Sequence, residues 1–258
     1  MKLSLIGAGP GDPDLITLKA IKTLAAADVI LYDALANPCL LSYASKEAEL
    51  VYVGKRLGQH SVSQDEINRI ILQNTLAGKH VARLKGGDPV IFGRGFEEMD
   101  YVSAYGVETE IIPGISSSVA VPSLKGIPVT KRGMAESFWV ITGHTKDRKL
   151  PKDMKLAAQS SATIVILMGI SKIEEIMEIF SANGKKATPV AIIQNGTTPE
   201  EKTITGEVFN IAEKAKTNNI QSPAIIVIGE TVRLCPDYIN SYLATNHLVE
   251  NEKQAKHG

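Results

Sequence analysis

Residues 7–12 read GAGPGD and follow the apolar run that opens the chain. A strand, a glycine-rich turn and an amphipathic segment, in that order, are typical of the first unit of an α/β nucleotide-binding fold. Gly7 and Gly9 match the G-x-G-x-x-G pattern, but Asp12 occupies the place of the third glycine. Asp12 is negatively charged and Pro10 lacks a backbone N–H, so the turn is poorly suited to pyrophosphate.

Strand-like and helical patterns alternate along the chain, which favours βαβ units and a parallel sheet. Asp12 and Pro13 predict the N-cap and first position of a helix, and Ser63 with Glu66 forms a second helix-start signal. Short polar turns such as GTTPEEKT (196–203) favour more antiparallel pairing late in the chain. The predicted strands are 2–6, 29–33, 49–54, 80–84, 108–112, 138–142, 162–168, 189–194 and 224–228, and the predicted helices are 14–26, 63–76, 97–105 and 173–182.

The stretch PGISSSVAVPSLKGIPVTKRG (113–133) contains three prolines, four serines and three glycines. This composition predicts a domain connection in or just before it. We therefore expect an N-terminal α/β domain over residues 1–113, a C-terminal α/β domain over 114–241, and a polar tail over 242–258.

The bulk composition excludes several classes of partner. The 258 residues contain 28 Lys and Arg against 28 Asp and Glu, so no global field attracts nucleic acid or a membrane surface. The apolar runs are too short to span a bilayer, and we predict a cytoplasmic protein. Cys39 and Cys235 lack metal-ligand spacing, which predicts no metal site and favours free thiols over a disulfide.

Charged and glycine-rich segments follow several predicted strands, at the edge where open α/β sheets bind ligands. They are Asp33 in YDAL (32–35), VGKR (53–56) and KGGDPVIFGRG (85–95). Each has an ordinary interpretation: Asp33 can cap a turn, and Lys55 with Arg56 can be a solvated pair. Their joint placement at one edge favours a functional site.

These segments, taken in order with GAGPGD, GQHSVSQDEIN (58–68), PGISSS (113–118) and QNGT (194–197), resemble the uroporphyrinogen III C-methyltransferases among the tetrapyrrole methylases. The resemblance runs from residue 4 to about residue 232. It implies a tetrapyrrole-methylase-like fold, two α/β domains with a cleft between them. It also implies a cytoplasmic homodimer that uses S-adenosylmethionine to methylate uroporphyrinogen III at positions 2 and 7, giving precorrin-2 for siroheme or cobalamin synthesis.

The resemblance further implies residue roles. The methyl donor is a cation without phosphate, so its site needs close backbone approach and hydrogen-bond acceptors, which Gly86, Gly87 and Asp88 can supply. Where the family often has Thr-Ala, this chain has Ser116-Ser117. By similarity, the donor-binding residues are Pro10, Gly86, Gly87, Asp88, Ile91, Ser116, Ser117, Met168, Gly196 and Ala224.

The acceptor carries eight carboxylates, which a neutral protein must meet with placed cations. The family's positions for a base and for a proton donor or charge partner match Asp33 and Lys55. Methyl transfer is an in-line attack by a pyrrole carbon, in which positioning supplies much of the acceleration. The candidate substrate-binding residues are Arg56, His60, Arg83, Lys85, Arg94 and Arg132, with Lys131 as a further cation.

Two other interpretations stay open at this point. A non-catalytic tetrapyrrole- or nucleotide-binding module could keep the fold without the chemistry, although the intact Asp33, Lys55 and GGD disfavour it. An NAD-linked oxidoreductase could use Asp33 as its ribose-binding acid, although Asp12 in place of the third glycine disfavours it.

Overall fold

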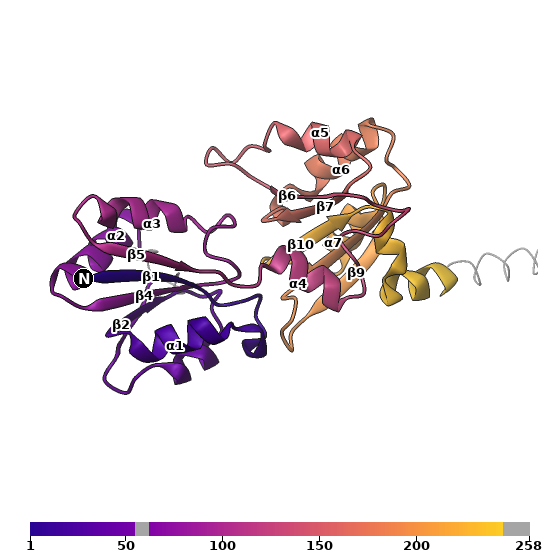
Figure 1. Cartoon of the computed structure of the whole chain (residues 1–258). Helices are drawn as coiled ribbons and strands as arrows, with labels where there is room; N and C mark the ends of the chain where they lie inside the picture. The colour runs from indigo at the N-terminus through magenta and orange to yellow at the C-terminus, as the bar shows by residue number, and fades with distance from the viewer. Residues whose placement is uncertain (55–61, 245–258) are drawn as a thin grey trace, which may run out of the picture. The chain divides into compact units, whose positions relative to one another are not determined.

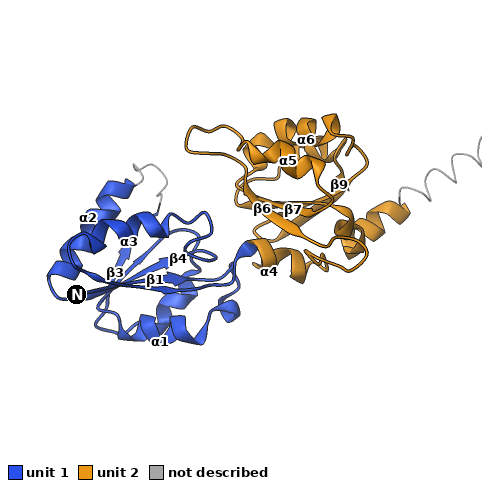
Figure 2. Cartoon of the chain, turned by 45° about the horizontal axis from the view of Figure 1, so that its top comes forward, with its two compact units in different colours: residues 1–117 blue, residues 118–258 orange. Residues whose placement is uncertain are grey.

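The computed structural model describes residues 1–54 and 62–244. The chain consists of two compact units, residues 1–117 and 118–258, shown in blue and orange in Figure 2. The division after Ser117 falls inside the segment 113–133, where the sequence places the domain connection.

Unit 1 holds a five-stranded, fully parallel sheet in the order β3-β2-β4-β1-β5. In Figure 1, α1 lies on one face of this sheet and α2 and α3 lie on the other. The elements are β1 (Lys2–Gly7), α1 (Leu18–Ala26), β2 (Val29–Tyr32), β3 (Glu49–Tyr52), α2 (Gln64–Leu76), β4 (His80–Lys85), α3 (Gly95–Ser103) and β5 (Glu108–Ile112).

Alternate side chains of β4 enter the two layers of unit 1. Val81 packs in the core cluster that includes residues of α2 and α3, whereas Ala82 and Leu84 pack in the cluster that includes residues of α1. Because side chains alternate along a strand, Arg83 and Lys85 share the face of Val81. The helix layer formed by α2 and α3 therefore receives two charged side chains near the carboxyl end of β4.

Unit 2 holds a mixed sheet in the order β6-β7-β10-β8-β9. Among the described strands of this sheet, β6 and β7 pair in parallel, and the pairs involving β8, β9 and β10 are antiparallel, as the short turns predict. The elements are α4 (Ser117–Leu124), β6 (Phe138–Thr142), α5 (Asp153–Gln159), β7 (Thr163–Leu167), α6 (Ile173–Ala182), β8 (Pro189–Gln194), β9 (Lys202–Glu207), α7 (Ile211–Thr217) and β10 (Ala224–Ile228).

The predicted start of the first helix is wrong. Instead of one helix over residues 14–26, the chain forms a 3₁₀ turn at Pro13–Leu15, with Asp12 as its cap, and α1 begins only at Leu18. Ile16 and Thr17 are extended, and the Thr17 hydroxyl accepts a hydrogen bond from the Ala20 N–H at 3.1 Å. Thr17 is therefore a second N-cap, whose preference overrides continuous helix.

The predicted strands are all present within one or two residues of their expected ends, but three α-helices and one strand of the described residues were not predicted. α5 and α7 are only seven residues long. β9 begins inside the polar segment that the sequence presents as a turn. α4 lies in the predicted connection and contains Pro122, which usually disfavours a helix interior.

Candidate functional site

Two glycine-rich loops meet at the carboxyl edge of the unit 1 sheet. The loop after β1 and the loop after β4 exchange backbone hydrogen bonds, from the Gly87 N–H to the Gly9 carbonyl (2.6 Å) and from the Gly9 N–H to the Gly87 carbonyl (3.2 Å). An added Cβ at Gly7 would lie 2.4 Å from the Gly114 backbone. The absence of side chains thus lets three segments of main chain pack against one another.

Gly86 and Gly87 are needed for different reasons. A Cβ at Gly86 would lie 2.6 Å from the Cβ of Leu35, so Gly86 permits the packing of the loop that follows β2. Gly87 has a φ of +67°, and a Cβ there would meet only the Ser117 backbone nitrogen, at 3.8 Å. Gly87 therefore supplies a left-handed turn beside which a ligand can approach the main chain.

Asp88 fixes the second loop to the segment after β5. Its carboxylate accepts hydrogen bonds from the Val90 N–H at 3.0 Å and the Gly114 N–H at 3.2 Å. The carboxylate that the sequence assigns to the donor site thus has a structural role, with one oxygen used by each N–H.

The other donor-site candidates of unit 1 lie around these loops. Pro10 is half-buried in the first loop and Ile91 is exposed in the second. Ser116 is buried, and Ser117 is the first residue of α4. Unit 1 therefore groups these candidates on the two loops and on the segment after β5.

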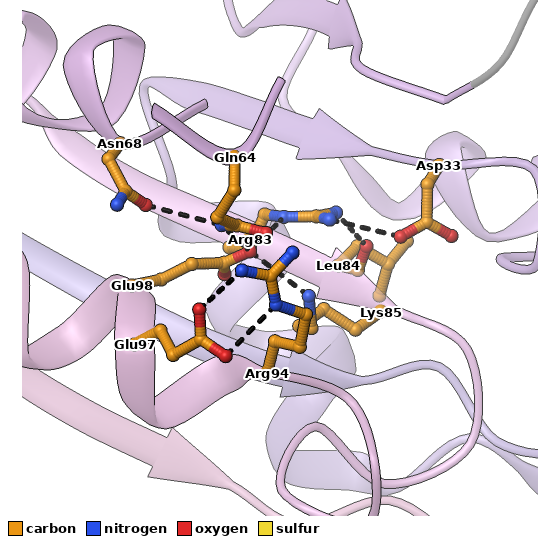
Figure 3. Close-up of polar contacts among 9 residues, drawn as sticks. All are labelled: Asp33, Gln64, Asn68, Arg83, Leu84, Lys85, Arg94, Glu97 and Glu98. Carbon is orange, nitrogen blue, oxygen red and sulfur yellow. Dashed lines mark hydrogen bonds and ion pairs between the residues drawn. The ribbon is translucent and has the colours of Figure 1, made fainter. Parts of the chain in front are cut away.

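Asp33 directly follows β2 at the same edge. Its Oδ1 accepts a hydrogen bond from the Leu35 N–H at 3.1 Å, as expected of a turn cap. Its Oδ2 forms an ion pair with Nη2 of Arg83 at 3.0 Å (Figure 3). Asp33 is partly exposed, so one carboxylate both caps a turn and joins a buried charge network.

That network lies between β4, α2 and α3. The carboxylate of Glu98, which is fully buried, pairs with Lys85 at 3.1 Å and with Nε of Arg83 at 3.4 Å. The Gln64 amide donates to Glu98 at 3.1 Å and to Asn68 at 3.2 Å. Burial and the charge of Arg83 lower the pKa of Lys85, and the attraction of Glu98 opposes this shift.

Arg83 and Lys85 are thus nearly inaccessible and already paired. The sequence suggests both as substrate ligands, because it shows only their charge and their position after an apolar run. Glu98, Gln64 and Asn68 were not predicted as site residues. The two-residue period of β4, which places Arg83 and Lys85 on a helix-covered face, is the signal that could have indicated a buried partner.

Arg94 differs from these two cations. It is the N-cap of α3 in a left-handed conformation and is exposed, with its guanidinium hydrogen-bonded to both carboxylate oxygens of Glu97. This pairing raises the pKa of Arg94. Arg132 and Lys131 are exposed in a turn of unit 2.

The remaining donor-site candidates belong to unit 2. Met168 follows β7, is 42% exposed and has a φ of +56°, and its carbonyl lies 3.2 Å from Nδ1 of His144. A Cβ at Gly196 would lie 2.5 Å from the side chain of Val121, so close packing against Val121 requires a glycine at this position. Ala224 is buried at the start of β10. The candidates Lys55, Arg56 and His60 lie outside the described residues.

A cavity of about 570 Å³ opens elsewhere in unit 2, lined by residues of α6, α7 and their flanking segments. It contains none of the predicted site residues. Within residues 1–54 and 62–244, no group of three or more metal-ligating side chains occurs, and no helix has the length and apolarity that crossing a membrane requires. Cys39 and Cys235 are free.

Comparisons with known proteins identify the family of this chain. The sequence model of the protein family of tetrapyrrole (corrin/porphyrin) methylases matches residues 2–212. A uroporphyrinogen-III C-methyltransferase of Methanocaldococcus jannaschii is 50% identical over 235 residues, which span 90% of this chain and 97% of that protein. A siroheme synthase of Pseudomonas aeruginosa is 41% identical over 89% of this chain, and this chain spans only 50% of that enzyme.

A solved structure of uroporphyrin-III C-methyl transferase from Thermus thermophilus, complexed with S-adenosyl homocysteine, matches with a TM-score of 0.78. It is 36% identical, and the match covers 90% of this chain and 99% of that one.

The parallel sheet of unit 1, with its glycine-rich carboxyl edge, places the chain in the class of α/β enzymes that bind ligands beyond the ends of parallel strands. Within that class, the match over residues 2–212 shows that the chain belongs to the tetrapyrrole methylases.

Proposed function

We propose that this methylase transfers two methyl groups from S-adenosylmethionine to uroporphyrinogen III, at positions 2 and 7, and releases precorrin-2. The observation that carries the proposal is the 50% identity to a uroporphyrinogen-III C-methyltransferase over 97% of its length. The order of the motifs in the sequence supports the same substrate. The product would serve siroheme or cobalamin synthesis.

The loops of unit 1 suit a methyl donor. Gly87 leaves space for a ligand beside the main chain, and no cation is needed because the donor carries no phosphate. We assign donor binding to Pro10, Gly86, Gly87, Asp88, Ile91, Ser116, Ser117, Met168, Gly196 and Ala224. The role of Asp88 is then to shape the loop as well as to offer its remaining lone pairs, since both oxygens already accept N–H groups.

The polyanionic acceptor requires a local cluster of cations, because the formal net charge of the chain is zero. Arg94 is the described cation at this edge that is exposed to solvent. We assign direct carboxylate contacts to Arg94, Arg56, His60 and Arg132. Arg83 and Lys85 act from beneath the surface, where they set the charge that the acceptor meets.

The chemistry assigned to the chain's own residues is positioning and proton removal. After the pyrrole carbon has attacked the methyl group, a proton must leave the macrocycle. Asp33 is partly exposed and is held by Arg83, so we assign it the role of base, with Lys55 as proton donor or charge partner. We further propose that the enzyme is a cytoplasmic homodimer and uses no metal.

The deciding experiment is an anaerobic incubation of the purified chain with uroporphyrinogen III and S-adenosylmethionine, followed by mass spectrometry. A gain of two methyl groups in the tetrapyrrole, with two equivalents of S-adenosylhomocysteine, is expected. Binding of S-adenosylhomocysteine without any methylated product would instead indicate a non-catalytic module. If the protein neither binds S-adenosylhomocysteine nor forms a methylated product, the proposal is rejected.

A further inference from the structure

Two cations of β4 are buried where the neighbouring core is apolar. Arg83 and Lys85 lie on the face of β4 that packs against α2 and α3, and each is less than a tenth exposed. Charges removed from water are costly unless they are paired with good geometry. Their partners therefore indicate what the fold retains them for.

Glu98 of α3 is the buried partner of both cations. Its Oε1 accepts from Nε of Arg83 and from Nζ of Lys85 (Figure 3). Oε2 is also buried and accepts no hydrogen bond from the described residues. The carboxylate is thus held through one oxygen, and that oxygen binds the cations.

The guanidinium of Arg83 connects this buried carboxylate to the surface. Nε faces Glu98, Nη1 donates to the Leu84 carbonyl at 2.9 Å, and Nη2 reaches Asp33 at 3.0 Å. A planar guanidinium with three occupied directions has a fixed orientation, unlike an ammonium on a flexible stem. Glu98 and Asp33 are therefore joined by one rigid group.

We propose that Glu98 is a positioning residue for Asp33: it acts through Arg83 and never contacts substrate itself. This inference rests on the proposed function, in which Asp33 is the base. With the second oxygen of Asp33 bound to Leu35, the carboxylate is held at both ends of its planar group. A base with a fixed orientation removes a proton from one position of the macrocycle only.

The same carboxylate controls a second property of the site. The charged groups that face Lys85 are Arg83 on its own strand, Glu98 on α3 and Asp33 after β2. Glu98 raises the pKa of Lys85 against burial and against Arg83. Removing the charge of Glu98 lowers that pKa, so Lys85 loses its proton at lower pH.

The test compares Glu98→Gln with Glu49→Gln, a matched control. Glu49 begins β3 at the other end of the sheet and forms an exposed ion pair with Lys79. Each variant is assayed per folded molecule, with S-adenosylhomocysteine affinity measured by calorimetry. For Glu98→Gln we expect kcat to fall about tenfold or more, donor affinity to stay within twofold, and the alkaline limb of kcat/KM for uroporphyrinogen III to move to lower pH. Glu49→Gln should match the wild type in all three.

Arg83→Lys provides a second, independent variant. It keeps the charge, but a lysine ammonium lacks the planar, directed N–H groups with which Arg83 binds Glu98, the Leu84 carbonyl and Asp33. We expect the same loss of kcat at unchanged donor affinity. If Glu98→Gln does not fold, this variant alone tests the positioning role. Wild-type kcat in either folded variant would overturn the positioning role. A wild-type chain that makes no methylated product would refute the proposed function instead, so the two failures are distinguishable.

Discussion

Two neighbouring glutamates of α3 show how differently one residue type can act. Glu97 is 54% exposed and pairs with Arg94, which is 56% exposed, over three positions of sequence. Glu98 is 0% exposed and pairs with Arg83 and Lys85, thirteen to fifteen residues away on β4. The two pairs lie at the same end of α3, but only one of them belongs to the interior.

The difference shows which charges can serve a ligand. An exposed ion pair contributes about 0–1 kcal/mol to stability, so Arg94 can exchange Glu97 for a carboxylate of the substrate at little cost. A buried pair loses several kcal/mol when one partner is removed. The charges around Glu98 must therefore stay together and act on the site through their arrangement.

The largest effect is expected where the buried network reaches the surface. Asparagine keeps the size and capping ability of Asp33 but cannot accept a proton at neutral pH. Asp33→Asn should reduce turnover by roughly 10²- to 10⁴-fold, with donor affinity little changed. Steady-state kinetics and calorimetry measure both.

The alternatives for Asp33 give other results. A residue that only caps the turn would leave activity near the wild type, and a ribose ligand would show its loss in cofactor binding. Retention of more than about a third of wild-type turnover would contradict the catalytic assignment.

The second prediction concerns stability and compares the two glutamates directly. Glu98→Leu leaves Arg83 and Lys85 without their shared carboxylate and should cost about 3–5 kcal/mol in the free energy of unfolding. Glu97→Leu should change it by less than about 1 kcal/mol. Urea titration of both variants provides the measurement, and equal losses would show that burial does not separate the two pairs.

The same contrast between exposed and buried groups separates the features that the sequence predicts from those that it does not. Strand positions were predictable because their apolar runs are continuous, and the glycine loops were predictable because glycine marks close backbone approach. The partners of Arg83 and Lys85 were not, because Glu98 and Gln64 meet β4 only after α2 and α3 pack on the sheet. The two-residue period of β4 indicates that Arg83 and Lys85 lie on a covered face, but it does not indicate which residues cover them.

Local signals also competed in ways that a sequence does not resolve. Asp12 and Thr17 are both good N-caps five residues apart, and the structure uses both, so one predicted helix became a turn and a helix. Pro122 and the serines around it suggested a linker, yet the segment is helical as α4 because Val121 packs in the core of unit 2. Tertiary packing decided the second case.

The third prediction concerns Gly87, in the loop after β4. This position has no charged side chain, so a substitution there tests the donor site without changing an ion pair. Valine there would fill the open side of the loop and strain a φ of +67°. Gly87→Val should weaken S-adenosylhomocysteine binding by at least tenfold, about 1.4 kcal/mol, in a protein that still folds. Unchanged calorimetric affinity in the folded variant would remove this loop from the donor site.

The fourth prediction tests the exposed member of the comparison. Arg94→Ala should raise KM for uroporphyrinogen III by a few-fold, roughly 1 kcal/mol, and leave KM for S-adenosylmethionine unchanged, because only the acceptor is polyanionic. The free energy of unfolding should remain within about 1 kcal/mol of the wild type. An effect confined to the methyl donor would assign this arginine to the other substrate.

The smallest effect is expected for a carboxylate of intermediate burial. Glu110 of β5 is 25% exposed and pairs with Lys2 and Lys19, and these hydrogen bonds lower its pKa to about 2. When folding lowers the pKa of a carboxyl group, the group stabilises the fold at pH values above its pKa in the unfolded chain. This stabilisation is lost as the pH falls toward the pKa in the folded protein. Because both lysines are partly exposed, solvent screening limits the gain to about 1 kcal/mol.

Glu110→Gln should therefore lower the free energy of unfolding by at most that amount at pH 7, and the difference from the wild type should shrink between about pH 4.5 and pH 2. Urea titrations at pH 7 and at the lowest pH where both proteins fold measure it. A difference that stays constant across this range would show that Glu110 acts through packing, whereas a loss as large as that of Glu98→Leu would show that partial exposure does not weaken an ion pair in this fold.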